Sequence, residues 1–253
     1  MILLKNNKDI EMLKQSGSIL VEILNVLVSE SKAGVALKSL DIQAQRLIRK
    51  YGAKPSFLGY KPQGAHKPYN AAICTSVNDQ IVHGLPSDYV LKDGDILKID
   101  IGINYKNYFT DAAVTLGIGK ISEQASKLIE ITRNALEKAI AVCLAGNHLG
   151  DIGWTIEQYV LANGFKVIKG LTGHGVGFAL HEEPTVYNYG KKGEGMELKP
   201  GLVIAIEPMA SIGTSEIRQL TDDSYATKDG SLSAHFEKTV AITENGPEVL
   251  TPF

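Results

Sequence analysis

Four acidic residues interrupt stretches of the sequence that are otherwise apolar and typical of β-strands. They are Asp100, Asp111, Glu207 and Glu237. Any single one could point into solvent from the polar face of an edge strand. If all four converge inside the protein, they cannot all stay ionised without a cation, because desolvation and mutual repulsion each favour protonation. Two divalent ions would balance the four negative charges, so the set favours a dinuclear metal centre in which two carboxylates bridge the ions.

Histidines in glycine-rich or turn segments could complete such a centre. His174 lies among glycines in residues 171–177, where the bare backbone would let an imidazole approach a buried ion closely. His83 and His181 lie beside other turns between predicted strands. A single histidine in such a loop is by default a partner in a loop hydrogen bond, so the indication comes from the set. We expect His174 to be the nitrogen ligand.

The elements that must position these side chains alternate along the chain. Apolar residues recur at helical spacing in residues 8–31, 39–52, 123–144 and 152–162, and Gly52 is a suitable stop for the second helix. Extended runs predict strands at residues 72–77, 96–103, 108–116, 203–206 and 235–242. A turn at Lys106 and Asn107 would let Asp100 and Asp111 meet on one face of an antiparallel pair. The single tryptophan, Trp154, lies in the fourth helix and is expected in the core.

Two helices followed by strands occur twice, in residues 1–118 and again in residues 119–253. The stretches 94–102 and 200–208 are similar, since each is an apolar strand with one acid near its end. This similarity is consistent with a pseudo-twofold repeat, although shared β-propensity explains it nearly as well. The sequence has no linker long enough to separate independent domains, so we expect one catalytic domain over residues 1–253.

Composition and charge exclude several classes of protein. The chain has 253 residues, 44% of them hydrophobic, which is enough for one large domain or two small ones. A net charge of -2 and an isoelectric point near 6.3 do not favour nucleic acid as the main partner. The two cysteines, Cys74 and Cys143, form no CxxC pair, which fits a reducing compartment. The apolar stretch 19–28 contains Glu22 and Asn25 and predicts an amphipathic helix, so we expect a cytoplasmic protein without a signal peptide or membrane span.

Several motifs, in their order and spacing, together resemble the type I methionine aminopeptidases, which share the pita-bread fold with prolidases and creatinases. The resemblance covers nearly the whole chain, and its motifs lie at residues 76–84, 98–100 with Asp111, 173–177, 180–184, 206–209 and 236–237. It implies an α+β fold in which a pseudo-twofold repeat of helices covers a curved, mostly antiparallel sheet. It also implies an enzyme that removes the initiator methionine from nascent polypeptides, with a preference for a small second residue.

The resemblance also assigns roles to individual residues. Asp100 would hold one divalent ion, His174 and Glu207 the other, and Asp111 and Glu237 would bridge the two. Glu207 would relay a proton to the leaving amine. The ions could be cobalt, manganese, iron or zinc, because carboxylates with one imidazole accept all of these.

Substrate contacts follow from the same resemblance. His181 would hydrogen-bond the peptide and stabilise the tetrahedral intermediate, and His83 would contact substrate at the mouth of the pocket. A small apolar pocket for the methionine side chain would be formed by Phe57, Tyr60, Cys74 and Leu180. The protein would act on N-termini of peptides and nascent chains as a monomer, and a ribosome contact is compatible with this role.

Two segments depart from the family's pattern. The loop at residues 61–70 is longer than usual, and Tyr69 is a candidate for the aromatic residue that commonly follows there. Residues 221–225 contain no tryptophan where many bacterial members have an Asp-Gly-Trp turn. The alternatives are a prolidase-like Xaa-Pro peptidase, which usually has an additional N-terminal domain, and a non-catalytic pita-bread protein, which would have lost its metal ligands.

Overall fold

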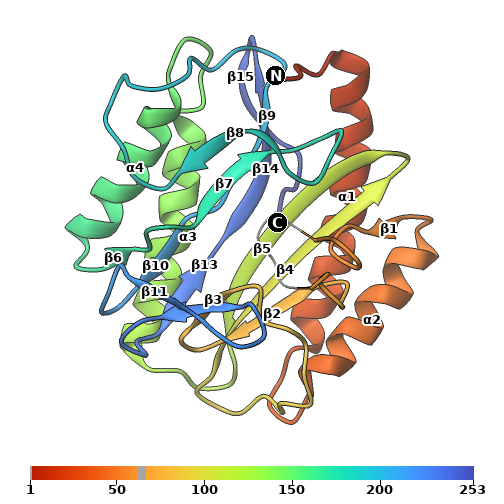
Figure 1. The fold of residues 1–253 in the computed structure, drawn as a ribbon, viewed down its shortest axis with the longest axis vertical. Helices are drawn as coiled ribbons and strands as arrows, with labels where there is room; N and C mark the ends of the chain where they lie inside the picture. The colour runs from red at the N-terminus through yellow and green to blue at the C-terminus, as the bar shows by residue number, and fades with distance from the viewer. Residues whose placement is uncertain (1, 62–66) are drawn as a thin grey trace.

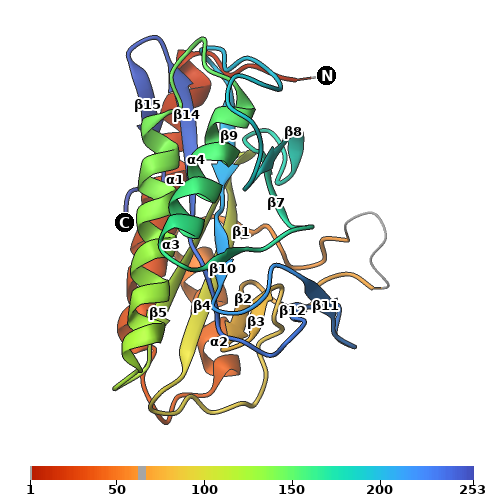
Figure 2. The same cartoon turned by 90° about the vertical axis from the view of Figure 1, so that its left-hand side faces the viewer.

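Four helices pack along a curved antiparallel sheet in the computed structural model, which describes residues 2–61 and 67–253. Figure 2 shows α1 and α3 along one side of the large sheet, with β11 and β12 on the other. The helices are α1 (Asn7–Glu30), α2 (Leu37–Lys50), α3 (Glu123–Ala141) and α4 (Leu149–Ala162). Within the described residues, no helix combines the length and apolar character that a membrane span requires.

Local hydrogen bonds explain where the helices begin and end. α1 begins with a reciprocal cap in which Asn6 Oδ1 accepts from the backbone of Asp9 and Asp9 Oδ2 accepts from Asn6 N. α2 ends before Gly52, whose φ of 70° confirms the predicted stop. α4 begins three residues earlier than predicted, because the Asp151 carboxylate accepts from His148 N at 2.7 Å and caps an extra turn.

All strand pairs in the described residues are antiparallel, as predicted, and they form three sheets (Figure 1). The largest contains β1 (Lys54–Pro55), β2 (Cys74–Val77), β4 (Ile96–Tyr105), β5 (Tyr108–Gly117), β7 (Thr172–Gly175), β8 (Glu182–Tyr187), β9 (Val203–Ile206), β14 (Glu237–Thr243) and β15 (Gly246–Val249). The second contains β6 (Lys166–Val167), β10 (Met209–Ser211) and β13 (Ser233–His235). The third contains β3 (Gln80–Val82), β11 (Ile217–Gln219) and β12 (Tyr225–Thr227).

The core lies between the large sheet and the helices. Leu97, Ile99 and Ile101 of β4 are fully buried in a cluster with residues of α1 and α2. A second cluster joins α3 and α4 to β9 and β14. Each buried aliphatic side chain contributes about 1.5–3 kcal/mol, so alternation along β4 fixes which face meets the helices. The alternate residues, including Asp100, therefore point to the opposite face.

Trp154 corrects one prediction, because its side chain is 38% exposed and does not belong to the core. The buried face of α4 is formed by Ile152, Ile156 and Val160, which recur every fourth residue. Trp154 lies between these positions on the helix, and Lys192 Nζ lies 5.7 Å from the centre of its ring. The expectation of a core position was wrong because it considered residue type and not helix phase.

Candidate metal centre

The five predicted metal ligands come from five strands that are neighbours in the large sheet. The order across the sheet is β4, β5, β14, β9 and β7. In that order the strands carry Asp100, Asp111, Glu237, Glu207 and His174, with Glu207 directly after the end of β9. Residues separated by up to 137 positions in the sequence are thus brought together by strand pairing.

Strand register places the acids of β4, β5 and β14 on one face. Asp100 pairs with Ala113 of β5, and Ala113 pairs with Glu237 of β14. Paired residues in a sheet share a face, so the carboxylates of Asp100 and Glu237 flank Ala113 on the same side. Asp111 lies two residues before Ala113 and therefore has the same orientation. The predicted meeting of Asp100 and Asp111 follows from this register.

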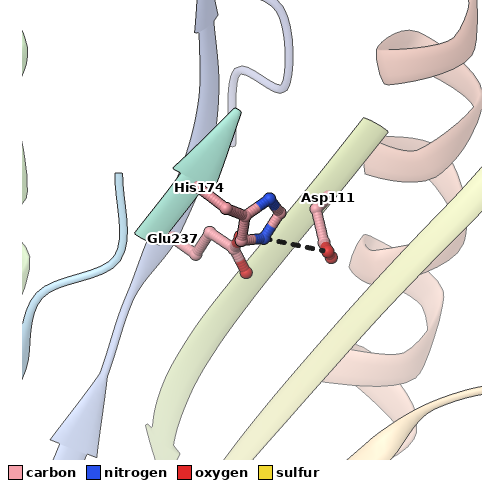
Figure 3. A group of neighbouring side chains, drawn as sticks. All are labelled: Asp111, His174 and Glu237. Atoms are coloured by element: carbon pink, nitrogen blue, oxygen red, sulfur yellow. Dashed lines mark ion pairs between the residues drawn. The ribbon is translucent and has the colours of Figure 1, made fainter. Parts of the chain in front are cut away.

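The same argument places Glu207 and His174. His174 pairs with Ala205 of β9, two residues before Glu207. The Nε2 atom of His174 lies 3.7 Å from Glu207 Oε1, 3.9 Å from Glu237 Oε1 and 4.0 Å from Asp111 Oδ2. Figure 3 shows the side chains of His174, Asp111 and Glu237 pointing toward one another.

Burial changes the proton affinity of every member of this cluster. The four acidic residues are between 2% and 9% exposed. Desolvation, followed by repulsion from the neighbouring acids, raises the pKa of Glu207 and Glu237 well above the usual carboxyl range. Desolvation also raises the pKa of Asp100 well above that range and the pKa of Asp111 to about 7. It lowers the pKa of His174 to about 4, so the imidazole is neutral at physiological pH.

The donor set fits divalent metal ions. Asp100 Oδ1 and Glu237 Oε1 are buried oxygens without a hydrogen-bond partner in the described structure, although buried acceptors are normally satisfied. Ligand atoms that share one ion at about 2.1 Å lie roughly 3–4 Å from one another. The separations around His174 Nε2 fall in this range, while they are too long for hydrogen bonds.

A cavity of about 1040 Å³ opens beside these residues. The predicted pocket residues Phe57, Tyr60, Cys74 and Leu180 all line it. Phe57, Cys74 and Leu180 form a buried apolar cluster, against which Tyr60 and Tyr69 pack. The structure thus provides an apolar recess next to the carboxylates.

The two predicted substrate-contacting histidines lie on the wall of the same cavity. His181 Nδ1 is 2.7 Å from the Tyr60 hydroxyl, and its ring packs edge to face on that of His174, with 4.3 Å between centres. Surrounding protein atoms lower the pKa of His181 to about 3, so it is neutral. The His83 ring lies edge-on to Tyr225 at 5.8 Å, and desolvation lowers the His83 pKa as well.

The turn that presents His181 is held by the next residue. Glu182 accepts hydrogen bonds from the backbone N–H groups of Phe178 and Ala179 through Oε1. Its Oε2 accepts from the buried ammonium group of Lys5, near the start of the chain. The ion pair and these two hydrogen bonds therefore hold the loop that carries His181.

One residue of the site was not predicted. His235 is 1% exposed, and its Nε2 lies 3.5 Å from Glu207 Oε2, on the side of Glu207 away from His174. Neither ring nitrogen has a hydrogen-bond partner within the described residues. His235 lies two positions before Glu237, and strand alternation at that spacing is the signal that could have identified it.

The two segments that depart from the family pattern both border the cavity. Gln219, Asp222, Asp223 and Tyr225 line the wall near residues 221–225. In the loop at residues 61–70, Tyr69 donates its hydroxyl to the carbonyl oxygens of Ile73 and Gly84 at 3.0 Å. Tyr69 therefore lies in the wall of the cavity, while residues 62–66 of this loop lie outside the described structure.

Comparison with known proteins agrees with this geometry. Residues 11–244 match metallopeptidase family M24. The chain belongs to metallopeptidase family M24. A methionine aminopeptidase of Clostridium perfringens is 46% identical over 252 residues, with 99% of each chain covered. The methionine aminopeptidase 1 of Bacillus subtilis is 41% identical over 252 residues, with 99% of each chain covered.

Solved structures extend the comparison to the fold. The crystal structure of a methionine aminopeptidase from Thermotoga maritima superposes with a TM-score of 0.95 and 40% identity over the whole of both chains. A prolidase from Pyrococcus horikoshii has a TM-score of 0.80 at 22% identity. The present chain covers 64% of the length of that prolidase. The second likeness concerns the fold alone. The predicted pita-bread fold and the predicted family resemblance are confirmed.

Proposed function

We propose that this M24 peptidase removes the N-terminal methionine from polypeptides, and that it uses two divalent metal ions to do so. The observation that carries the proposal is the convergence of four buried carboxylates and one neutral imidazole beside an apolar recess. Full-length identity of 46% to a methionine aminopeptidase supports the choice of substrate. The Xaa-Pro alternative has only the shared fold in its favour.

The ligand roles in this proposal are those implied by the resemblance. Asp100 would hold one ion, and His174 and Glu207 would hold the second. Asp111 and Glu237 would each bind both ions. Two ions carry four positive charges, which match four ionised carboxylates in a site that excludes most water. When bound, the ions supply an activated water near neutral pH and polarise the scissile carbonyl group.

The side chains around the ions move and hold protons. Glu207 accepts a proton from the attacking water and returns it to the leaving amine, a role that suits a carboxylate held between two imidazoles. His181 Nδ1 lies 2.7 Å from the Tyr60 hydroxyl, and with the hydroxyl as donor the proton of the neutral ring is on Nε2. His181 Nε2 then donates to the peptide oxygen as negative charge develops there.

The apolar recess explains a preference for methionine. An unbranched thioether side chain fits irregular apolar walls, and sulfur interacts favourably with ring edges such as that of Phe57. The same enclosure would leave little room for a bulky second residue. We further propose a monomeric cytoplasmic enzyme that acts on nascent chains, with the metal identity set by availability in the cell.

Peptide selectivity tests the proposed function. Protein reconstituted with manganese is expected to cleave Met-Gly-Xaa with a kcat/KM at least about tenfold above that for Met-Leu-Xaa, because excluding a branched side chain from a narrow site is worth 1–3 kcal/mol. Ala-Gly-Xaa should be a poor substrate, because alanine leaves the apolar recess largely empty. Liquid chromatography of released amino acids measures all of these rates.

A panel of Xaa-Pro peptides separates the proposal from its rival. Methionine aminopeptidase activity predicts little cleavage of Leu-Pro and Gly-Pro substrates under the same conditions. A higher kcat/KM for these peptides than for Met-Gly-Xaa would assign the protein to the prolidases. No turnover of any peptide by metal-loaded protein would favour the non-catalytic alternative.

A further inference from the structure

Lys98 is the largest side chain that is fully buried in the described structure, with 1% exposure. It lies on β4 two residues before Asp100, so both side chains point to the face of the sheet that carries the site. Buried lysines are normally paired with a carboxylate. Within the described residues, none lies within 4 Å of Lys98 Nζ, so the ammonium group depends on other partners.

The partners of the ammonium group are backbone carbonyl oxygens from two distant segments. Lys98 Nζ donates to Asn78 O at 2.7 Å and to Ser233 O at 3.1 Å. Asn78 O also accepts from Ser233 N at 3.1 Å and from Ser233 Oγ at 3.3 Å. Ser233 Oγ is in addition 3.0 Å from Gln80 O, to which it donates. Asn78 O and Ser233 O thus both accept from the Lys98 amino group. Burial lowers the pKa of Lys98 to about 7, while these two acceptors favour its ammonium form.

Each of the two segments leads directly to a residue of the site. Asn78, with φ of 54°, begins the turn between β2 and β3, and that excursion ends at His83 with φ of 61°. Ser233 begins β13, which ends at His235, two residues before Glu237. The ammonium group therefore links the segment that leads to His83 with the segment that leads to His235 and Glu237.

β13 belongs to the second sheet but is fastened onto β4 and β5 of the first. At one end it is held by Lys98 through Ser233 O. At the other end Thr115 Oγ1 donates to His235 O at 2.6 Å and accepts from His235 N at 2.8 Å. Lys98 and Thr115 are direct partners in the pairing of β4 with β5. Lys98 and Thr115 therefore hold the two ends of β13, the strand that carries His235.

We propose that Lys98 is a positioning residue, whose ammonium group acts as a built-in monovalent cation and clamps the Asn78 and Ser233 carbonyl oxygens so that His83, His235 and Glu237 keep their places. The proposal rests on the proposed function only for its activity readout. Its structural content is that a cation must occupy this position. If the amino group is removed, a free ion of similar size should take its place.

Methionine is the replacement that tests this proposal, since it keeps the length of the lysine stem, with sulfur in place of one methylene, and lacks the terminal amino group. Lys98→Met is expected to lower kcat/KM for Met-Gly-Xaa by roughly 10–100-fold in choline chloride, the range typical for residues that support a metal site. Ammonium or potassium chloride at equal ionic strength should restore most of this loss and raise the Tm. Wild-type protein should show neither response, because its own ammonium fills the position.

Crystals of Lys98→Met soaked in rubidium chloride give a readout that does not depend on activity. Rubidium is close to ammonium in size and scatters anomalously, so one peak is expected between Asn78 O and Ser233 O, and none there in the wild type. The control Lys138→Met makes the same chemical change at an exposed lysine of α3 and should respond to no cation. Lys98→Gln supplies a neutral donor in place of the cation, so it should fold and remain about as impaired as Lys98→Met in choline chloride.

Three results would overturn the proposal. The first is a loss in Lys98→Met that no small cation restores, whether the variant folds or not. The second is a rubidium map without a peak at the two carbonyl oxygens. The third is a Lys98→Gln variant with wild-type activity in choline chloride, because a neutral donor would then suffice. The rubidium peak and the Tm response could appear in Lys98→Met while the wild type cleaves no peptide. In that case the role proposed for Lys98 is supported and the proposed function is wrong.

Discussion

Asparagine in place of Asp111 is expected to lower kcat by at least about 10³-fold and to weaken the binding of divalent ions. The amide has the size of the carboxylate but no charge, so it cannot neutralise two cations at once. A metal centre supplies several kcal/mol of charge stabilisation, and about 4 kcal/mol corresponds to a thousandfold change in rate. Hydrolysis of Met-Gly-Xaa and manganese content by atomic absorption measure the two effects.

Asp151→Asn is the matched control for this experiment. Asp151 is also a buried aspartate, but it lies in α4, and backbone N–H groups of His148 and Gly193 donate to it at 2.7 and 2.9 Å. These donors lower the pKa of Asp151, whereas burial raises the pKa of Asp111. The control should keep its metal content and kcat. An Asp111→Asn variant with wild-type activity would show that Asp111 does not bridge.

Glutamine in place of Glu207 is expected to lower kcat by at least about 10³-fold even at saturating manganese. The side chain keeps its length and its place between His174 and His235, but it can no longer accept and return a proton. Proton transfer by a positioned group contributes about 10²–10⁴-fold, and loss of a charged ligand adds to this. KM should change little, because the pocket residues are untouched.

The pH profile distinguishes proton transfer from a purely structural role of Glu207. If Glu207 transfers the proton, the wild-type kcat is expected to change with pH near neutrality, and the kcat of Glu207→Gln should depend little on pH in that range. Glu216→Gln, a change at an exposed glutamate of the ion pair with Lys228, serves as control and should keep the wild-type profile. A variant at Glu207 with reduced kcat but an unchanged profile would assign the proton relay to another group.

Alternation along single strands was enough to predict much of this site. Asp100 and Asp111 could be placed on one face because Lys106 and Asn107 form the turn between their strands, and both residues do adopt positive φ. The order of helices and strands could be predicted for the same reason, since helical and strand periods are local. The division into halves at residue 118 stays a prediction.

Contacts between distant strands could not be predicted without the family resemblance. Ala113 pairs with both Asp100 and Glu237, and nothing local in the sequence specifies that second pairing. The burial of Lys98 was hidden for a related reason. Its position on the polar face of β4 was evident, but the carbonyl oxygens that receive its ammonium come from segments 20 and 135 residues away.

His235 was missed because it precedes the break between β13 and β14. Sequence alone predicted one continuous strand at residues 235–242, in which an acid was the residue of interest. The structure ends one strand at His235 and begins the next at Glu237, on a different sheet. The imidazole lies beside Glu207, 28 positions earlier in the sequence, and nothing local in the sequence specifies that partner.

Calorimetric titration of metal-free protein with manganese at pH 7 tests the central claim most directly. The raised pKa values of the four carboxyl groups mean that the metal-free cluster retains protons at this pH, with Asp111 near its midpoint at about 7. His174 is already neutral, because its pKa is lowered to about 4. Ions bind the ionised carboxylates, so binding must release protons and must strengthen as the pH rises.

Titrations in two buffers of different ionisation enthalpy report the number of protons released. We expect two ions per chain and a release of at least one proton at pH 7, with both quantities reduced in Asp111→Asn. Saturable binding that releases no proton and is unchanged in Asp111→Asn, or no binding at all, would contradict the claim that these buried carboxylates are held together by divalent ions.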